Sequence, residues 1–431
     1  MRRGSCPAGA LIAVAAAWVL AGAAHAQAQV DTPPPPPVSP PPPITQPQPG
    51  PAQPFSIGLS ETLTHDSNFF RTSTNEEAEW TSVTALNFGL DQMFGRQRLH
   101  GNAALQMNRY KEHDELNNTG HDVALQLDWE TAGDLSGVLG AQSIRRQYRF
   151  GLDSATPLDD ARNIESTQSG YFQGRLGGMG EWALLVGANA LDRGYSNATF
   201  AADNDLSQWS GEGGIGYKPS PDLGGQLLAR YTRISRPDTS FYDDSSRKDL
   251  ELGVFWQASG ASRFDVRLTR SEEKHAVLAD RSFWTGGIGW DWAPSGKLRL
   301  RTQVLRDIEG GSGNVATPEA TMPAVPAGDQ LRDAFIWSAQ WAATAKINVI
   351  GGVQWSRRKL SQLLEVGGGH LSDRTTAVTL GVQYSPARAL DLGCNIASER
   401  RDSNAVSIAD LALTRDYDAL AAGCTFQFWF R

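Results

Sequence analysis

The chain has 431 residues, 40% of them hydrophobic, and a formal net charge of −8. This acidic balance argues against broad nucleic-acid binding, which needs a basic face. Three cysteines are too few to scaffold so long a chain, and no apolar run reaches the ~20 residues that a spanning helix needs.

The N-terminus has the pattern of a secretory signal peptide. Met1-Arg2-Arg3 is followed by an apolar stretch that ends in Ala24-His25-Ala26, the small-x-small pattern of a cleavage site. We expect residues 1–26 to be removed, which takes the formal charge from −8 to −10 because two arginines leave and no acid does. The alternative is a membrane anchor, for which the apolar run is short.

Residues 27–54 form a proline-rich linker. Proline fixes φ and has no N–H, so this segment should be extended and join neither a sheet nor a helix. It is interpreted as a disordered periplasmic spacer, or as a tether that reaches periplasmic partners.

From residue 55 to residue 431 the pattern is a uniform period-two alternation, typical of strands with two different faces. Val123, Leu125, Leu127 and Trp129 alternate with smaller or polar residues, and the runs 250–256 and 378–384 behave in the same way. Several runs end in an aromatic residue just before a tight-turn sequence, as expected for an aromatic girdle at a membrane interface: Trp129, Tyr217, Trp256, Trp292, Trp341 and Tyr384.

Short turns near residues 95, 132, 179, 220, 259, 295, 343 and 387 alternate with nine longer polar segments. The predicted fold is therefore all-β, a transmembrane antiparallel up-and-down β-barrel of about 18 strands (16–18), in the outer membrane of a Gram-negative bacterium. A barrel of this size encloses a water-filled lumen. The segment 310–329 is either a plug or an outer loop.

Parity along the strands predicts which side chains line the lumen. They either pair with each other across a wet interior or form a polar track for a hydroxyl-rich polymer. The candidates are Arg230, Arg267, Arg299, Arg301, Asp128, Glu251, Asp291, Asn348, Gln354, Asp391 and Asn395.

Enzyme chemistry is not indicated. The chain has no G-x-S-x-G and no H-E-x-x-H, and the histidines after residue 26 are scattered without metal-ligand spacing. We predict no catalytic residues, no metal and no cofactor. Cys394 and Cys424 fall on the last two predicted strands with the same apolar-face parity, and form either a disulfide or two small thiols.

The segment Thr64-His65-Asp66-Ser67-Asn68-Phe69-Phe70-Arg71 resembles the opening of the EpsL-type outer-membrane barrels, which are associated with exopolysaccharide biosynthesis and exosortase loci. The segments 217–223 and 298–307 are similar to that family as well. In this segment Asp66, Asn68 and Arg71 cap a loop through backbone hydrogen bonds, or contact the polymer directly.

The resemblance implies an outer-membrane channel that exports an extracellular polysaccharide, and we expect the barrel to be monomeric or trimeric. Its expected partners are the polysaccharide chain, outer-membrane lipid, the outer-membrane assembly machinery and the periplasmic parts of an export complex, with no nucleic acid. The alternatives are a general or solute-specific diffusion porin, and a plugged barrel that scaffolds a surface assembly.

Overall fold

The computed structural model describes residues 54–150, 162–177, 181–236, 244–276, 280–309, 330–359, 372–403 and 416–430. The expected signal peptide, almost all of the linker, the segment 310–329 and Arg431 lie outside these residues. The strands are β1 (Phe55–Asp66), β2 (Glu79–Phe94), β3 (Gln97–Tyr110), β4 (Asn118–Glu130), β5 (Leu135–Gln147), β6 (Ile164–Leu176), β7 (Trp182–Tyr195), β8 (Leu206–Ser220), β9 (Leu223–Ser235), β10 (Ser245–Ser259), β11 (Ser262–His275), β12 (Arg281–Ser295), β13 (Leu298–Glu309), β14 (Gln330–Ala342), β15 (Ile347–Lys359), β16 (Ser372–Ala387), β17 (Leu390–Ser403) and β18 (Tyr417–Phe430).

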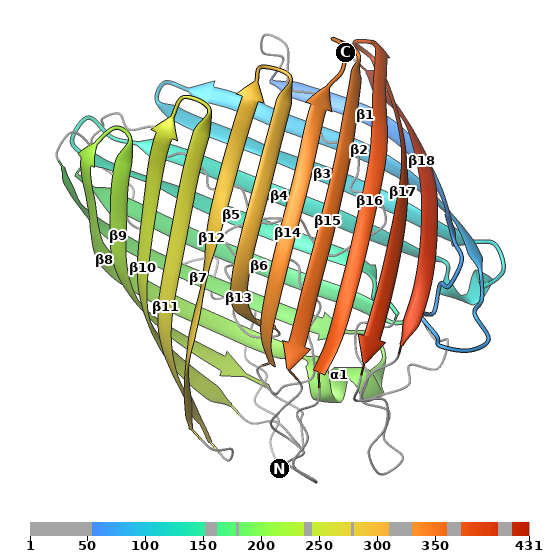
Figure 1. Ribbon diagram of the computed structural model, residues 1–431, viewed down its shortest axis with the longest axis horizontal. Helices are drawn as coiled ribbons and strands as arrows, with labels where there is room; N and C mark the ends of the chain where they lie inside the picture. Colours follow the sequence, from blue (N-terminus) through green and yellow to red (C-terminus); the bar gives the residue numbers. More distant parts are fainter. Residues whose placement is uncertain are drawn as a thin grey trace.

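Each strand pairs antiparallel with its neighbours in sequence, and β1 pairs with β18 to close the ring (Figure 1). The prediction of an up-and-down barrel of about 18 strands is confirmed. Strands alternate between short turns and longer connections, as the sequence indicated. Two short helical segments, η1 (Asp114–Leu116) and α1 (Ala198–Asn204), were not predicted, and both lie in the longer connections. Among the described residues, no helix is long and apolar enough to cross a membrane.

The two ends of the barrel differ. The short turns lie at one end, at the top in Figure 1, and α1 lies at the other. We call these the short-turn end and the loop end. In outer-membrane barrels the short turns face the periplasm and the long loops face outward, so the loop end is the outer one.

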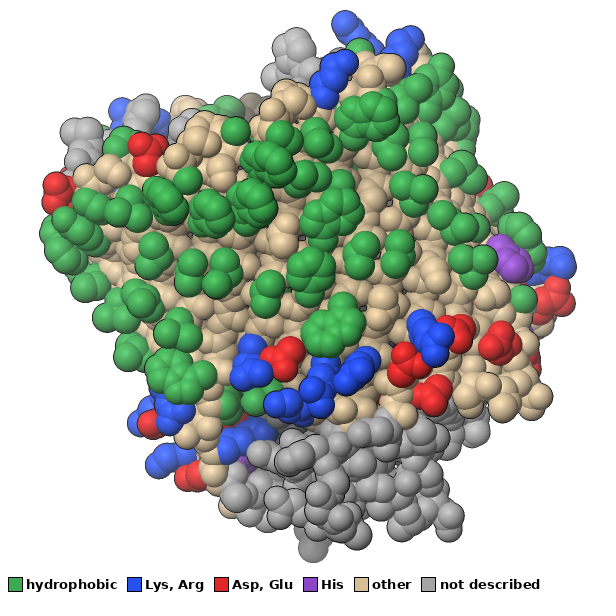
Figure 2. All heavy atoms as spheres, in the orientation of Figure 1, with side chains coloured by type: hydrophobic (Ala, Val, Ile, Leu, Met, Phe, Trp, Pro, Cys, Tyr) green, Lys and Arg blue, Asp and Glu red, His purple; other side chains and the backbone are tan. Residues whose placement is uncertain are grey.

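The barrel is inside-out relative to a soluble protein. Large hydrophobic side chains such as Leu252, Val304 and Leu380 are exposed on its outer face, whereas buried positions include Arg247, Asp249 and many other polar residues. Figure 2 shows hydrophobic side chains covering most of one outer face. A continuous apolar exterior is costly in water and suits lipid, so the chain has the architecture of an outer-membrane β-barrel.

Aromatic residues mark both edges of this apolar belt. At the short-turn end Trp256, Trp292 and Trp341 are exposed on the outer face. On β8, Trp209 lies eight residues before the girdle residue Tyr217, and on β12, Trp284 lies eight residues before Trp292. Eight residues at ~3.3 Å each, on strands tilted by about 40°, give a belt roughly 20 Å thick, near the ~25 Å of known barrels. The outer edge was not predicted; its aromatic residues are Trp80, Trp209, Tyr231, Trp284 and Trp355.

The strand number sets the width. Eighteen strands spaced about 4.8 Å apart and tilted by about 40° give a backbone diameter of roughly 35 Å. Side chains from the wall alone do not fill so wide an interior, so what lines it and what crosses it decide what the barrel does.

Candidate functional site

The predicted lumen residues occupy the inward-facing positions of their strands. Arg230 and Glu251 lie on neighbouring strands β9 and β10, and Glu251 is 6% exposed. Arg299 is exposed close to the short-turn end, whereas Gln354 is buried. The remaining candidates lie at the same parity on the other strands: Arg267, Arg301, Asp128, Asp291, Asn348, Asp391 and Asn395.

One group of lumen charges is built across three strands. Arg230 of β9 lies 2.7 Å from the carboxylate of Glu212 on β8 and 3.6 Å from that of Glu251 on β10. Gly187 on β7 leaves room for this arrangement, because a Cβ there would stand 2.6 Å from Glu212 Oε1. The arginine therefore links two acids that would otherwise repel each other.

A second group lies on β11, β12 and β13. Arg301 Nη1 donates to Asp291 Oδ2 at 2.7 Å, and its Nη2 lies 4.0 Å from Asp265 Oδ1. Arg267 is paired with Asp307 at 3.2 Å. Gly289 is required here, since a Cβ would stand 2.5 Å from Asp265 Oδ2.

Two further candidates, both aspartates, contact uncharged or weakly basic side chains. Asp128 accepts a hydrogen bond from Gln126 at 2.7 Å and lies 3.1 Å from His100 Nε2. Asp391 accepts from Ser385 Oγ at 2.5 Å and from Trp429 Nε1 at 3.2 Å. The candidates thus do not converge on one site; they form several local groups of mixed sign along the inner wall.

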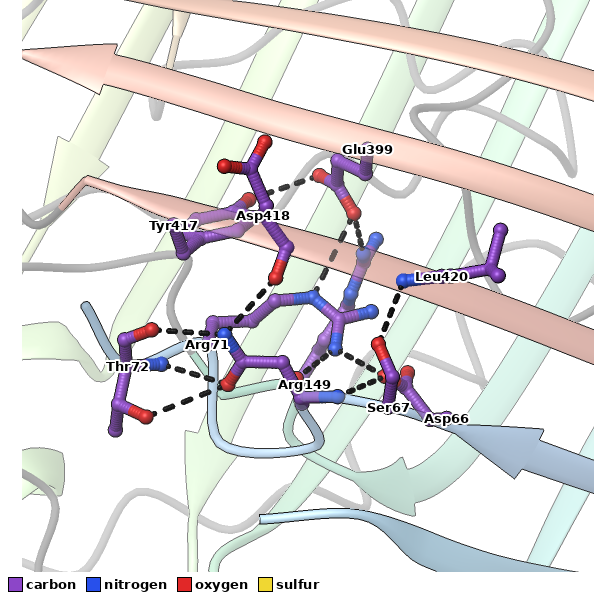
Figure 3. A network of polar contacts seen from close by, with 10 residues as sticks. Asp66, Ser67, Arg71, Thr72, Arg149, Glu399, Tyr417, Asp418 and Leu420 are labelled. Carbon is purple, nitrogen blue, oxygen red and sulfur yellow. Dashed lines mark hydrogen bonds and ion pairs between the residues drawn. The ribbon is translucent and has the colours of Figure 1, made fainter. Parts of the chain in front are cut away.

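The opening motif forms a network at the loop end (Figure 3). Asp66 Oδ1 accepts from the backbone N–H of Asn68 at 3.1 Å and from Arg71 Nη1 at 2.8 Å. Asn68 is fully buried, donating to the carbonyls of Thr72 and Asp418 and accepting from the N–H of Thr72. These contacts cap the loop and attach it to the start of β18, so Asp66 and Asn68 act as loop-capping residues.

Arg71 carries the network into the barrel. It has a φ of 57°, a left-handed conformation that costs a non-glycine residue energy, and it is 5% exposed. Its Nε lies 3.6 Å from Glu399 Oε2, on the inward face of β17. Burial alone lowers the pKa of the Arg71 guanidinium, but its hydrogen bond to Asp66 and the charges of Asp66 and Glu399 raise that pKa above its ordinary value.

Glu399 also binds Arg149, in the segment that follows β5. Five strands lie between β5 and β17 around the ring, which is roughly 30 Å of wall. The segment 148–150 must therefore leave the wall and cross the loop-end mouth. Figure 3 shows Arg71 and Arg149 approaching Glu399 from different elements, with Tyr417 on its other side. The Tyr417 hydroxyl donates to Glu399 Oε1 at 2.9 Å.

Apolar contacts also fix the segment 148–150 in place. Phe150 and Phe70 are buried together with Leu116 of η1, and the two rings lie 4.8 Å apart with their planes at 68°. Tyr148 packs with Tyr195 and with Phe200 of α1 in a second buried cluster. We call the segments 68–71 and 148–150, with Leu116, Tyr195 and Phe200, the loop-end cap.

His113 joins the loop-end cap to a buried carboxylate. Glu79 Oε2 lies 2.7 Å from His113 Nδ1, and the same carboxylate accepts the backbone N–H groups of Lys111 and Glu112. The His113 ring packs edge-on against Phe70. Burial alone lowers the pKa of His113, but Glu79, with the charges of Glu115 and Glu77, raises it above its ordinary value.

The predicted girdle and cysteines lie on the outer face. Trp256 and Trp292 belong to a run of near-parallel rings with Phe264 and Trp290, at centroid spacings of 5.4 to 5.8 Å. Trp129 stacks on Phe172, and Tyr217 packs against Trp182. Trp341 and Tyr384 are also exposed, close to the short-turn ends of β14 and β16. Cys394 is directly opposite Cys424, and a disulfide joins them with Cα atoms 4.1 Å apart.

Glu399, Arg149, Phe150, Glu79 and His113 were not among the predicted site residues. Inward parity on β17 was a usable signal for Glu399. The contacts of these residues could not be predicted from the sequence, because they depend on where the loops after β1, β3 and β5 fold. Within the described ranges, no group of three or more His, Cys, Asp or Glu side chains could hold a metal ion.

The chain matches no known protein-family model, and no curated protein is similar to it in sequence. Solved structures of Pseudomonas aeruginosa barrels are similar in fold. OpdQ has a TM-score of 0.49 at 11% identity, covering 88% of this chain and 100% of its own. OccK3 (OpdO) has 0.46 at 11%, covering 87% and 95%, and OccK1 (OpdK) has 0.47 at 14%, covering 87% and 99%. Similarity at this level says nothing about the substrate.

Proposed function

We propose that this barrel is a diffusion channel for small hydrophilic solutes across the outer membrane. The observation that carries the proposal is the inner wall, where arginines and carboxylates pair in local groups around Arg230 and Arg301. Such a wall stays hydrated and presents mixed charge, so solutes of either sign can pass without tight binding.

The loop-end cap supports the same proposal. A segment that crosses the mouth at Arg149 and Glu399 narrows the entrance on one side of a ring roughly 35 Å wide. A narrowed, polar entrance selects solutes by size, which is what a diffusion channel requires.

Export of a polysaccharide is the competing proposal, and it depends on the resemblance of the opening motif. In the motif Asn68 is 0% exposed, and Asp66 Oδ1 already accepts two hydrogen bonds from the loop itself. Their structural role explains the motif without a polysaccharide. We therefore place diffusion first.

Swelling of proteoliposomes that contain the purified chain tests the proposal. Neutral sugars of increasing size should permeate at rates that fall steeply with size, and monosaccharides should enter readily. If none of these sugars permeates, the diffusion channel is excluded and a plugged scaffold is favoured. A chromosomal deletion supplies the second arm: unchanged amount and length of secreted polysaccharide are expected, and a clear loss would favour export.

A further inference from the structure

The outer face carries a row of charged residues at the loop end. In register across β13, β14, β15, β16 and β17, the outward residues are Arg306, Asp333, Arg357, Arg374 and Asp402. Figure 2 shows Lys and Arg side chains, with some Asp and Glu, directly below the hydrophobic face. The row lies at the edge of the apolar belt.

The two flanks of the row are neutralised. Arg306 Nε donates to Asp333 Oδ1 at 2.6 Å. Asp402 is bound by Arg400, whose Nη2 donates to it at 3.0 Å, and Arg400 also faces Asp418 at 3.9 Å. The acids of β14, β17 and β18 therefore already have arginine partners.

The centre of the row carries an excess of positive charge: Arg357 and Lys359 act on Asp333 across the register, but the carboxylate of Asp333 already accepts the hydrogen bond of Arg306. Arg357 is directly opposite Arg374, a like-charge pair that destabilises neighbouring strands, and Lys359 follows two residues later on the same face. Among the described residues, none of these three cations has a hydrogen bond or ion pair from its side chain, and Arg357 Nε is buried without a partner. Three cations on one face of two adjacent strands, without hydrogen bonds of their own, favour binding of a further anion there.

The position of the centre says what kind of molecule carries that anion. Trp355 lies two residues from Arg357 on the same face, and Val378 and Leu380 continue the strand that carries Arg374; all three are exposed on the apolar belt. A ligand that fills this place has acyl chains against the belt and a negative headgroup at its edge.

We infer that Arg357, Arg374 and Lys359 form a binding site for the phosphate of a phosphorylated glycolipid in the outer leaflet. Guanidinium groups bind phosphate oxygens through paired charge-assisted hydrogen bonds, and a site that excludes water on the lipid side strengthens them. This site lies on the outside of the wall and is independent of what passes through the lumen.

Native mass spectrometry of the full chain in a neutral detergent tests the inference, with diphosphorylated lipid A as the probe. The double variant Arg357→Gln/Arg374→Gln should weaken lipid A binding by roughly 10-fold or more, since each basic residue contributes to headgroup attraction. Arg357→Lys/Arg374→Lys keeps the charge and should retain most of the binding. Dephosphorylated lipid A should bind weakly to the unmodified chain.

The matched control is Lys248→Gln/Arg270→Gln, which removes the same charge from the outer face of β10 and β11. Lys248 is opposite Glu272, and Arg270 donates to Ser282 at 2.8 Å, so neither belongs to the unpaired centre. The control should change lipid A binding less than 2-fold. Equal losses in both double variants, unchanged binding in the first, or displacement of lipid A by millimolar inorganic phosphate would each overturn the inference.

Discussion

Replacing Glu399 with glutamine removes the carboxylate that Arg71 and Arg149 share, while keeping the size of the side chain. Glu399 is 4% exposed, so its loss leaves two nearby guanidinium groups without that counter-charge. Breaking a buried ion pair by removing one partner typically costs about 3–5 kcal/mol.

The crossing segment is also held by apolar burial. Phe150 is 4% exposed and Tyr148 is 1% exposed, and burying one such side chain stabilises by about 1.5–3 kcal/mol. The two rings together therefore contribute about the same free energy as the loss of Glu399 removes. We expect the Glu399→Gln segment to move between docked and released positions, and a further Phe150→Ala substitution to release it.

Single-channel recording in planar bilayers measures this directly. Glu399→Gln should fluctuate between the level of the unmodified chain and a higher one, and Glu399→Gln/Phe150→Ala should stay at the higher level. Both variants should also shift the reversal potential in a salt gradient towards anion preference, since arginines at the mouth lose their counter-charge. Asp402→Asn, on the outer face of the same strand, is the control for charge and should change neither quantity.

If the conductance levels and the ion preference of Glu399→Gln/Phe150→Ala equal those of the unmodified chain, the segment does not narrow the mouth. The assignment of the loop-end cap as an entrance constriction would then be wrong.

Three further predictions concern the loop end and the last hairpin. Asn68→Ala should loosen the loop after β1, because it removes the fully buried side chain that donates to the carbonyls of Thr72 and Asp418, each bond contributing about 0.5–1.5 kcal/mol; proteolysis should cut this loop faster, while exposed Ser73→Ala should have no effect. The His113–Glu79 contact should be strongest at mildly acidic pH, where His113 is protonated and Glu79 is ionised, because a raised folded pKa gives stability that is complete below the unfolded value, near 6.5, and is lost as the pH rises through the folded value. The hydrogen-exchange protection of residues 111–117, relative to the intrinsic exchange rate at each pH, should fall over that rise; constant protection, or the same fall in His113→Gln, would contradict it. Cys394→Ser/Cys424→Ser should unfold at lower denaturant, since closing a loop of about 30 residues contributes roughly 3–4 kcal/mol in the chain-entropy description; an unchanged midpoint would show that β17 and β18 are held by their ladder alone.

The wall of the barrel was predictable because each strand needs only local information. Alternation at Val123–Trp129 and the turn after Trp292 specify which face meets lipid and where the strand ends, and the register follows from short hairpins. The inward orientation of Arg230 and Arg301 likewise follows from the alternation of side chains between the two faces of a strand. Their ion-pair partners Glu212 and Asp291 lie on adjacent strands, so these ion pairs could be predicted from the sequence.

The loop-end cap was not predictable by the same means. Phe70, Leu116 and Phe150 come from three connections, and they meet only because the ring brings the loop ends of their strands together. Arg71 reaches Glu399 because β1 closes onto β18, a contact between residues more than 300 positions apart. Nothing in a period-two pattern encodes which loops turn inward. The exposed aromatic residues at the loop end, such as Trp209 and Trp284, were missed because they follow long loop sequences, whereas the predicted aromatic residues precede tight turns.

The central claim is that a closed ring of strands encloses a hydrated path through the membrane. Single-channel recording of the purified, unmodified chain in planar bilayers tests this most directly. We predict discrete conductance steps of uniform size, carried by cations and anions alike. A folded, membrane-inserted chain that passes no current at any voltage would contradict the account.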